Sequence, residues 1–364
     1  MGVRHRPGVG GLVAGTVGLL LVVPLSGCQS GSAAPEGVGR EGGLPPVTSA
    51  PAPTEETPLA PTPALQPATA PLTGVPVDAA DGVTGVRPAV AVAISVRRAA
   101  PPAEGLDAAD VIYEEIGRRG PTRLLALFHS MDTGRVGPVT TTRPLDPKLL
   151  SVAAPLYAHK GGSTGFLQQV ANSDLVDVSY AEHPRAYDGD GAPGTTPDAL
   201  FTSTRKLRRA GASDLAPPPA LFVHASAGQQ LAGEGLTAAA TLRVPLPGPD
   251  AVWRLDTESG QWRRDDGSGV TAAADNVIVQ QVQYRTIRVR YPDGRTVRTA
   301  LPQGAGRIHV VSGDQSATGT WYKPFGRTVT NYADTAGAPM KLAPGRTWVM
   351  LAPRGTRTTV RSGS

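Results

Sequence analysis

The segment from His159 to Gly165, with the sequence His-Lys-Gly-Gly-Ser-Thr-Gly, combines residue types that suit the binding of an anion. It lies between an expected strand and an expected helix, so free backbone N–H groups at the helix start would point toward a bound carboxylate or phosphate. His159 and Lys160 would add positive charge, and the two glycines after them would let the backbone approach closely. The segment does not match the nucleotide-binding P-loop, because no lysine follows the second glycine. The competing interpretation is a turn whose glycines simply permit close packing.

Patterns typical of hydrolases are mostly absent. The chain contains no His-Glu-x-x-His or Gly-x-Ser-x-Gly sequence, and its six scattered histidines offer no zinc-ligand spacing. Ser203 and Lys206 fit the Ser-x-x-Lys pattern of penicillin-binding enzymes, and a helix beginning at Ser203 would place both on one face. The partner sequences Ser-Asp-Asn and Lys-Thr-Gly are absent, which favours a chance match. We therefore expect neither a metal site nor a cofactor.

Two tryptophans near the C-terminus, Trp321 and Trp348, have two possible roles. Their rings could stack on the sugars of a glycan. Tryptophans more often lie in the core of a β-sheet, where the indole N–H finds one backbone partner. We favour the core for both.

The elements that would position these residues are strands and short helices in the first half of the folded region. Apolar runs bounded by Gly or Pro predict strands over residues 89–96, 111–116 and 123–128, with a further strand over 156–159. Helices are predicted over 146–153 and over 163–172, the second capped by Ser163 or Thr164. Strands that alternate with helices favour an α/β subdomain with a mixed sheet, over residues 87–215.

The pattern changes after the triple proline at 217–219. Strands are predicted over residues 251–255, 260–263 and 277–284, and Asp266-Gly267 and 292–294 have the composition of hairpin turns. The expected fold is therefore α+β, with a β-rich C-terminal subdomain over residues 216–364. We find no fixed-period repeat and no further membrane-spanning run.

The N-terminal residues have the layout of an export signal. Arg4 and Arg6 precede an uncharged apolar run over residues 8–23, which is too short to span a bilayer comfortably. The tetrad Leu-Ser-Gly-Cys that ends at Cys28 is similar to the bacterial lipobox. Small residues there would give the signal peptidase access to the bond before a lipidated cysteine.

This tetrad predicts a signal peptide over residues 1–27 and a mature chain that begins at Cys28. Lipid on Cys28 would hold the protein at the extracytoplasmic face of the bacterial cell membrane. Cys28 is the only cysteine, so we interpret it as an anchor, and an intrachain disulfide is excluded. The alternative is a free thiol beside an ordinary export signal.

Residues 28–86 are rich in Pro, Ala, Thr, Gly and Ser and contain almost no bulky apolar side chains. Such a composition predicts a disordered linker without a core. The net charge of +5 comes mostly from scattered arginines. An ordinary solvated surface is favoured over affinity for anionic wall polymers, and the scatter disfavours nucleic acid as a partner.

Beyond the linker, several ordered motifs resemble the YerB-like lipoproteins, a bacterial family defined by the DUF3048 domain of unknown function. The motifs are Arg-Pro-Ala-Val-Ala-Val (87–92), Gly-Leu-Asp-Ala-Ala-Asp-Val-Ile-Tyr-Glu (105–114), Gly-Pro-Thr-Arg-Leu (120–124), Gly-Pro-Val-Thr-Thr-Thr-Arg (137–143), Tyr-Ala-His-Lys-Gly-Gly-Ser (157–163), Gly-Thr-Trp (319–321) and Leu-Ala-Pro-Gly-Arg-Thr-Trp (342–348). The resemblance covers most of the chain after the linker and is weakest over residues 211–275.

The chain departs from the family pattern at two places. Thr140 replaces the first arginine of Gly-Pro-Val-Arg-Ser-Ala-Arg, and Asp198 with Ala199 replaces the His-Asn pair of Pro-His-Asn-Leu-Tyr-Thr. If those side chains formed a reactive centre in relatives, this chain has lost it. The resemblance implies an envelope lipoprotein with two subdomains and brings no established reaction.

Together these patterns favour a binding or scaffolding module for an anionic envelope ligand, such as a cell-wall polymer, or for an envelope protein. The residues expected to bind the ligand are Arg123, Arg143, His159, Lys160, Gly161, Gly162 and Ser163. The alternative function is an enzyme acting on wall polymers, with Glu114 as acid or base beside Arg143 and His159. A structural Glu–Arg pair at a sheet edge is the third interpretation of Glu114.

Overall fold

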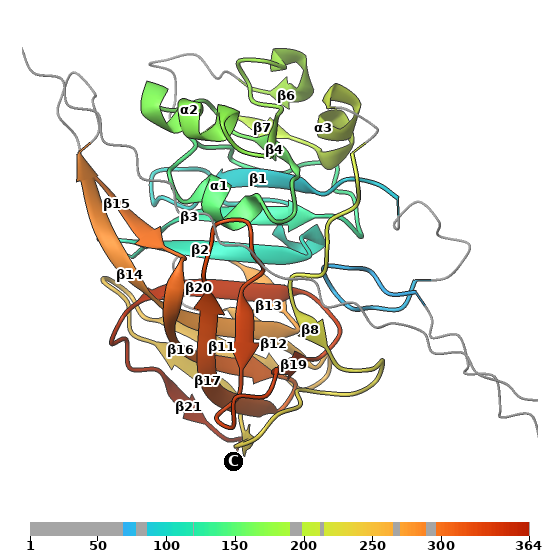
Figure 1. Cartoon of the computed structure of the whole chain (residues 1–364), viewed down its shortest axis with the longest axis vertical. Coiled ribbons are helices and arrows are strands. Elements are labelled where there is room, and N and C mark those ends of the chain that lie inside the picture. Colours follow the sequence, from blue (N-terminus) through green and yellow to red (C-terminus); the bar gives the residue numbers. More distant parts are fainter. Residues whose placement is uncertain are drawn as a thin grey trace, which may run out of the picture. The chain divides into compact units, whose positions relative to one another are not determined.

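The computed structural model describes residues 68–77, 86–118, 120–189, 199–211, 215–264, 270–288 and 296–363. The chain is built mostly from strands, with few helices (Figure 1). The helices are α1 (Asp146–Leu150), α2 (Thr164–Ala171), α3 (Thr204–Ala210) and the 3-10 turns η2 (Leu106–Ala108) and η3 (Pro184–Ala186).

The strands are β1 (Val90–Ser95), β2 (Val111–Gly117), β3 (Gly120–Phe128), β4 (Leu156–Ala158), β5 (Val176–Asp177), β6 (Tyr187–Asp188), β7 (Phe201–Thr202), β8 (Val223–His224), β9 (Thr237–Ala238), β10 (Thr241–Val244), β11 (Ala251–Asp256), β12 (Gln261–Arg264), β13 (Ala272–Ala274), β14 (Asn276–Arg288), β15 (Thr296–Leu301), β16 (Gly304–Ser312), β17 (Gln315–Lys323), β18 (Asn331–Ala333), β19 (Lys341–Leu342), β20 (Thr347–Pro353) and β21 (Thr359–Arg361). The predicted strands in both halves of the chain and the two predicted helices are confirmed, with shifts of a few residues at their ends.

Twelve of these described strands form one mixed sheet. Ten follow the order β18-β17-β16-β14-β20-β2-β3-β1-β4-β5, while β15 pairs with β14 and β9 with β17. The apolar runs of β1 and β20 are buried along almost their whole length, as expected for strands covered on both faces. The centre of the sheet is parallel, because β20 lies between β2 and β14 and runs parallel to both.

The large sheet has a hydrophobic core on each face. On one face it packs against a second sheet with the strand order β13-β12-β11-β10-β21, and Trp253 meets Trp348 edge-on at 5.3 Å between ring centroids. On the other face it packs against α1 and α2. Trp321 and Trp348 are both buried, as predicted for core residues.

The two halves of the chain contribute to the same large sheet. Strands β1 to β5 come from the predicted N-terminal subdomain, and β14, β16, β17, β18 and β20 come from the predicted C-terminal one. Residues Ala64–Ser364 group into one compact unit. The division into subdomains at residue 216 therefore stays a prediction about the chain's organisation.

Part of the predicted linker belongs to the fold. Residues 68–77 form a turn closed by a bridge between Thr69 and Pro76, and Leu72 is fully buried in the core. Gly345 also donates its N–H to the Thr73 carbonyl at 2.8 Å. The prediction of a linker without a core over residues 28–86 is wrong for this segment, because a single leucine supplies the apolar contact that composition concealed.

Several predictions fall on residues outside the described part of the chain. They concern Cys28, the signal peptide over 1–27, the remaining linker, the hairpin turns at 266–267 and 292–294, and Asp198.

Candidate arginine cavity

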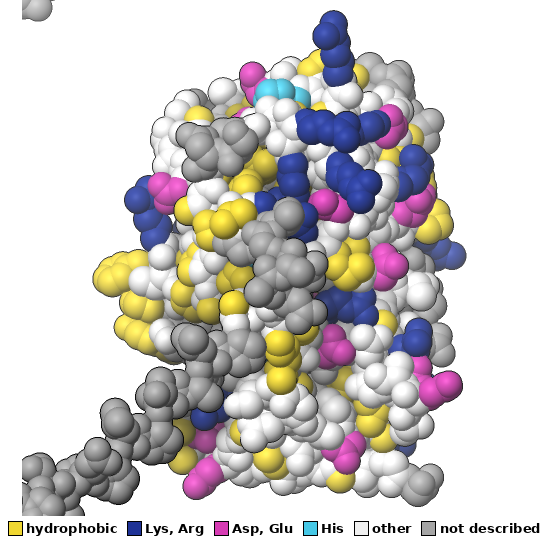
Figure 2. Space-filling model, turned by 90° about the vertical axis from the view of Figure 1, so that its right-hand side faces the viewer, with side chains coloured by type: hydrophobic (Ala, Val, Ile, Leu, Met, Phe, Trp, Pro, Cys, Tyr) yellow, Lys and Arg dark blue, Asp and Glu magenta, His cyan; other side chains and the backbone are white. Residues whose placement is uncertain are grey.

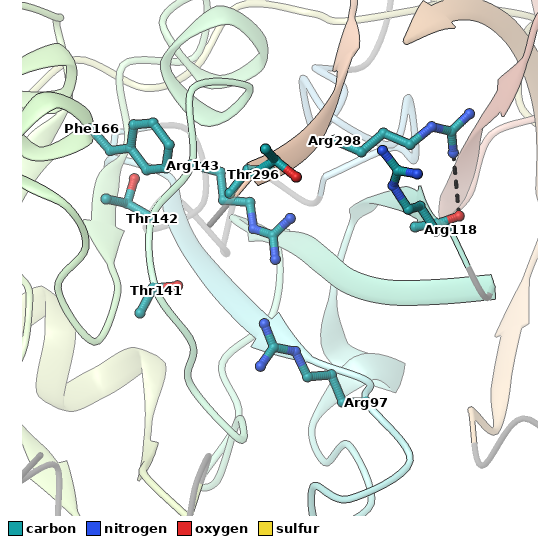
Figure 3. Close-up of a pocket in the computed structure, with 10 residues that line it drawn as sticks. Arg97, Arg118, Thr141, Thr142, Arg143, Phe166, Thr296 and Arg298 are labelled. Carbon is teal, nitrogen blue, oxygen red and sulfur yellow. Dashed lines mark hydrogen bonds between the residues drawn. The ribbon is translucent and has the colours of Figure 1, made fainter. Parts of the chain in front are cut away.

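A cavity of about 410 Å³ opens where five segments of the chain meet (Figure 3). We call it the arginine cavity because Arg97, Arg118, Arg143 and Arg298 all line it. The remaining lining residues are Gly117, Thr141, Thr142, Phe166, Thr296 and Val297. They come from the chain after β1, the end of β2, the segment before α1, helix α2, and β15.

The cavity lies beside a fork in the large sheet. β14 pairs with β20 as far as Val282 opposite Pro353, and beyond that point it pairs only with β15. The β14–β15 ribbon therefore projects from the sheet, as Figure 1 shows. Side chains bridge this fork: Ile116 donates its N–H to the Tyr284 hydroxyl at 3.0 Å, and that hydroxyl donates to the Leu351 carbonyl at 2.6 Å.

Arg298 is held in place on the ribbon side of the cavity. Its Nη1 donates to the carbonyls of Ile116 at 3.1 Å and Gly117 at 3.3 Å, and its guanidinium lies 4.0 Å from the centre of the Tyr284 ring. Neutral carbonyls and a ring face fix the guanidinium without cancelling its charge. Arg298 thus presents a preorganised cation.

The other cavity arginines face little compensating charge. Arg97 and Arg118 make no ion pair with any described residue, although Arg118 Nη2 lies 3.4 Å from Thr286 Oγ1. Arg143 Nη1 lies 3.7 Å from Glu115 Oε2. Burial lowers the pKa of Arg143 below the usual arginine value; Glu115 opposes this shift, and Arg123 and Arg97 add to it. None of the residues that line the cavity is acidic, so it carries a surplus of positive charge.

A buried network fixes the wall from which Arg143 projects. Arg123 forms a two-pronged salt bridge with Asp146, at 2.5 and 2.6 Å, and both side chains are buried. Asp146 Oδ2 also accepts from the Arg143 backbone N–H at 2.8 Å, from Thr142 Oγ1 at 3.1 Å and from the Tyr157 hydroxyl at 2.5 Å. Burial alone would lower the pKa of Arg123, but the contact with Asp146 raises it above the usual arginine value. Arg123 thus supports the cavity from behind and does not line it.

The turn that contains His159 also lies behind this wall. Lys160 donates its N–H to the Thr140 carbonyl and Gly161 accepts from the Thr142 N–H, both at 2.8 Å. Gly161 has φ +97°, and a Cβ on Gly162 would come within 2.8 Å of Thr142 Cγ2. The glycines therefore allow the turn to pack closely on the segment that lines the cavity, and none of the residues from His159 to Ser163 lines it.

Two side chains of this turn are buried. His159 Nε2 lies 3.3 Å from Asp177 Oδ1, and its Nδ1 accepts from the Gly161 N–H at 3.0 Å. This contact with His159 lowers the pKa of Asp177, although burial opposes the shift. Ser163 is the N-cap of α2, and its buried Oγ has no hydrogen-bond partner in the described structure.

Comparison with known proteins identifies the family. The sequence model described as "Protein of unknown function (DUF3048) N-terminal domain" matches residues 72–216, and that of the corresponding C-terminal domain matches residues 244–349. The chain belongs to the DUF3048 family. This confirms the resemblance found in the motifs.

Within the DUF3048 family, a curated relative is "Putative lipoprotein YerB" from Bacillus subtilis. It is 32% identical over 123 residues, which is 34% of this chain and 34% of the relative, so the match spans about a third of each protein. The crystal structure of the YerB protein from Bacillus subtilis superposes with a TM-score of 0.64 at 20% identity, over 80% of this chain and 99% of that chain. This likeness shows that the two share a fold.

The DUF3048 motif residue Glu114 lies on the opposite face of β2 from the arginine cavity. Arg264 Nη1 donates to both of its carboxylate oxygens at 2.8 Å, and Trp348 Nε1 donates to Oε2 at 2.8 Å. Glu114 and Arg264 are fully buried. The structure therefore does not bring Glu114 together with Arg143 and His159. The contacts of Glu114 are those of a structural Glu–Arg pair, with Arg264 as the arginine.

The sequence analysis missed four residues that lie at or directly behind the arginine cavity: Arg97, Arg118, Arg298 and Glu115. Strand alternation could have found Glu115, since it lies opposite Arg123 in the β2–β3 register and shares its face. Arg97 directly follows the strand predicted over residues 89–96, and Arg118 directly follows the observed end of β2 at Gly117. No local signal indicated Arg298, which contacts Gly117 from 181 residues away along the chain.

Other sequence candidates have structural partners. Ser203 caps α3 by accepting from the Lys206 N–H at 3.2 Å, and Lys206 Nζ pairs with Asp188 at 2.6 Å. Among the residues that the structure describes, no helix is long and apolar enough to cross a membrane. The same residues contain no group of three or more His, Cys, Asp or Glu side chains placed to hold a metal ion.

Proposed function

We propose that this DUF3048 protein is a lipid-anchored protein of the cell envelope that binds an anionic ligand in the arginine cavity. The observation that carries the proposal is the charge of the cavity: four arginines face one space lined by no acidic residue. Guanidinium groups form strong, directional hydrogen bonds with carboxylates and phosphates. A ligand that brings negative charge would therefore relieve the repulsion among the four arginines.

The cavity also has features that favour a specific site over a patch of surface charge. The guanidinium of Arg298 is held by the Ile116 carbonyl, so it loses little freedom when it binds a ligand, and Asp146 fixes the backbone from which Arg143 projects. Thr141 and Thr296 offer hydroxyl groups, and Phe166 and Val297 offer apolar contact. This mixture suits a small anionic molecule or the charged end of a larger polymer or protein.

The geometry does not support the alternative function, an enzyme that acts on wall polymers with Glu114 as acid or base. Such an enzyme requires Glu114 as acid or base, yet both oxygens of that carboxylate are occupied in the core by Arg264 and Trp348. A general acid or base must reach the proton that it transfers. The geometry therefore supports binding better than catalysis by these residues.

The location is supported by the relative named as a putative lipoprotein and by the lipobox-like tetrad that ends at Cys28. A diacylglyceryl group and an N-acyl chain would hold the protein stably at the extracytoplasmic face of the membrane. Replacement of Cys28 by Ala should move the protein from the membrane fraction to the soluble fraction of the producing cell. Retention in membranes would contradict the lipid anchor without bearing on the cavity.

The binding proposal is tested by titrating the full chain, purified in a non-ionic detergent, with inorganic pyrophosphate in a calorimeter. Arg97→Ala should weaken the affinity by about fivefold or more, because it removes a cation that lines the cavity. Arg98→Ala is the matched control, since Arg98 is also exposed but does not line the cavity. Equal affinities of both variants and the parent chain, or no binding by the parent, would overturn the proposal.

A further inference from the structure

One edge of β15 lies at the cavity and has no strand partner among the described residues. Along its other edge it pairs with β14, from Gln283 opposite Leu301 to Arg288 opposite Thr296. In the described part of the chain no strand pairs with the outer edge. Unpaired N–H and C=O groups on such an edge form a template for another extended chain.

A hydrogen bond shows which residues of β15 direct their backbone groups outward. The Ala300 N–H donates to Glu115 Oε1 at 3.4 Å, on the side away from β14. Backbone groups of an antiparallel strand alternate in direction along the strand. The N–H and C=O groups of Arg298 and Thr296 therefore also point away from β14, and both residues line the arginine cavity.

We propose that the ligand of the arginine cavity is an extended peptide that carries carboxylates and adds to the outer edge of β15. This inference rests on the proposed function, because it specifies what the anion-binding cavity holds. Main-chain hydrogen bonds would pair the peptide with Thr296 and Arg298, as in other cases of strand addition.

Charge complementarity selects an acidic peptide over a neutral one. In Figure 3 the side chains of Arg298 and Arg118 lie on one side and those of Arg143 and Arg97 on the other. We expect a strand beside β15 to run between these two pairs. Side chains of an extended peptide alternate between two faces, so carboxylates at alternate positions or at a terminus can meet these guanidinium groups.

The ribbon of β14 and β15 lies where β14 has lost its other strand partners. Further along the sheet, β14 is flanked by β16 and β20, which satisfy its backbone groups on both sides. Past Val282 those partners end, and the side chains of Tyr284 and Arg298 bridge the gap to the end of β2. Since the Ala300 N–H already donates to Glu115, the backbone groups that a peptide would meet on this edge are those of Thr296 and Arg298.

The first experiment uses the full chain in non-ionic detergent, immobilised and incubated with a mixture of acetylated pentapeptides. One mixture alternates Asp or Glu with Val, Thr or Ala, and a second replaces Asp and Glu by Asn and Gln. Mass spectrometry of the retained peptides should show enrichment of the acidic mixture only, and pyrophosphate should displace it.

The second experiment tests the backbone contacts of a retained peptide. Methylation of its amide nitrogens at one set of alternate residues should weaken binding by about tenfold, and methylation of the other set should change it little. Thr296→Pro removes an outward N–H at the first residue of β15 and should lower the affinity for the peptide by a similar factor. Thr296→Val keeps that N–H but also lacks the hydroxyl group, so the difference between the two variants isolates the loss of the N–H. Pyrophosphate affinity should be equal in the two variants if the proline has not changed the shape of the cavity.

The outcomes separate this inference from the proposed function. Binding of pyrophosphate with no enrichment of acidic peptides would overturn the inference and leave the anion site standing, with a phosphate-type ligand. Peptide binding that is insensitive to amide methylation would show that the side chains alone are held and would also overturn it. Binding of neither probe would remove both proposals.

Discussion

Two neighbouring carboxylates on β2, Glu114 and Glu115, point to opposite faces of the same sheet and meet opposite electrostatic conditions. Glu114 receives two hydrogen bonds from one arginine, Arg264, and a third from Trp348, deep between the two sheets. Glu115 faces Arg143 at 3.7 Å, at the back of a cavity that three more arginines line. Charge is balanced at the first place and in surplus at the second. We infer that the first region serves stability and the second binds a ligand.

The surface agrees with this division. Lysine and arginine side chains are spread over the face shown in Figure 2, with Asp and Glu among them. Several of the described cations have acidic partners: Arg87 and Arg208 both pair with Asp132, and Lys206 pairs with Asp188. Such exposed or half-exposed pairs contribute little individually. The arginine cavity is unusual because its lining contains the cations without the anions.

The largest effect that would sharpen the comparison is on stability. Glu114→Gln would remove the carboxylate charge from the buried salt bridge with Arg264, which costs about 3–5 kcal/mol in the free energy of unfolding. Urea denaturation of the full chain measures this loss. Pyrophosphate affinity of the folded variant should stay unchanged, because Glu114 does not line the cavity.

A paired substitution controls for the loss of packing. Glu114→Leu combined with Arg264→Met removes both charges and should recover most of the lost stability. If Glu114→Gln costs less than about 1 kcal/mol, or if it weakens pyrophosphate binding, the division between the two faces is wrong.

The second effect is on binding. Arg143→Met removes a cation of the cavity and should lower the affinity for pyrophosphate by about tenfold to a hundredfold, as measured by calorimetry. The matched control is Arg87→Met, because the Arg87 side chain is 16% exposed and pairs with Asp132, much as Arg143 is 15% exposed and pairs with Glu115. Both variants should lose some stability, but only Arg143→Met should lose affinity. A similar loss in both would show that affinity follows stability alone.

A smaller effect is expected from the network behind the cavity wall. Tyr157→Phe deletes the 2.5 Å hydrogen bond to Asp146, which should cost about 1 kcal/mol of stability and weaken pyrophosphate about threefold, because Asp146 positions the Arg143 backbone. Tyr187→Phe also removes a buried hydroxyl, which donates to the Val178 carbonyl away from the cavity. It should lower stability without changing the affinity. Equal affinities of the two variants would show that the network does not position Arg143.

The strands and the cavity differ in how far the sequence predicts them. The apolar runs of β1 and β20 are local signals, because a strand buried on both faces needs apolar residues at every position. The sequence did not predict that the segment around Leu72 belongs to the core, because one buried leucine gives no periodic pattern. The sequence also placed Arg143 in a polar pocket, where its guanidinium does line the arginine cavity.

The choice of Glu114 over Glu115 shows what a motif omits. The presence of an acidic residue in a motif does not indicate which face of the strand its side chain takes. The alternation of side chains between the two faces, counted from buried neighbours, does indicate it. Arg298 shows a deeper limit. It reaches the cavity because β14 leaves the sheet at the fork, and that departure depends on where β20 ends, far along the chain.

The smallest effect tests the one carboxylate near the cavity through pH. Burial raises the pKa of Glu115 above the usual glutamate value, and Arg143 and Arg123 oppose the shift. The folded state thus holds this proton more tightly than the unfolded state, so its contribution to stability is present below the usual glutamate pKa and is lost as pH rises through the raised value. In that same window the ionised Glu115 competes for Arg143, so anion affinity should fall a few-fold with rising pH.

Sulfate is the probe for this effect, because its own charge stays constant over the range. Glu115→Gln removes the competing charge and should bind sulfate as tightly at high pH as the parent does at low pH, with a flatter dependence of both affinity and unfolding free energy on pH. Glu104→Gln is the control, because Glu104 is exposed and pairs with Arg135 away from the cavity. A parent chain whose sulfate affinity rises with pH would show that Glu115 does not oppose the arginines, since only the protonated carboxyl leaves Arg143 free to bind the ligand.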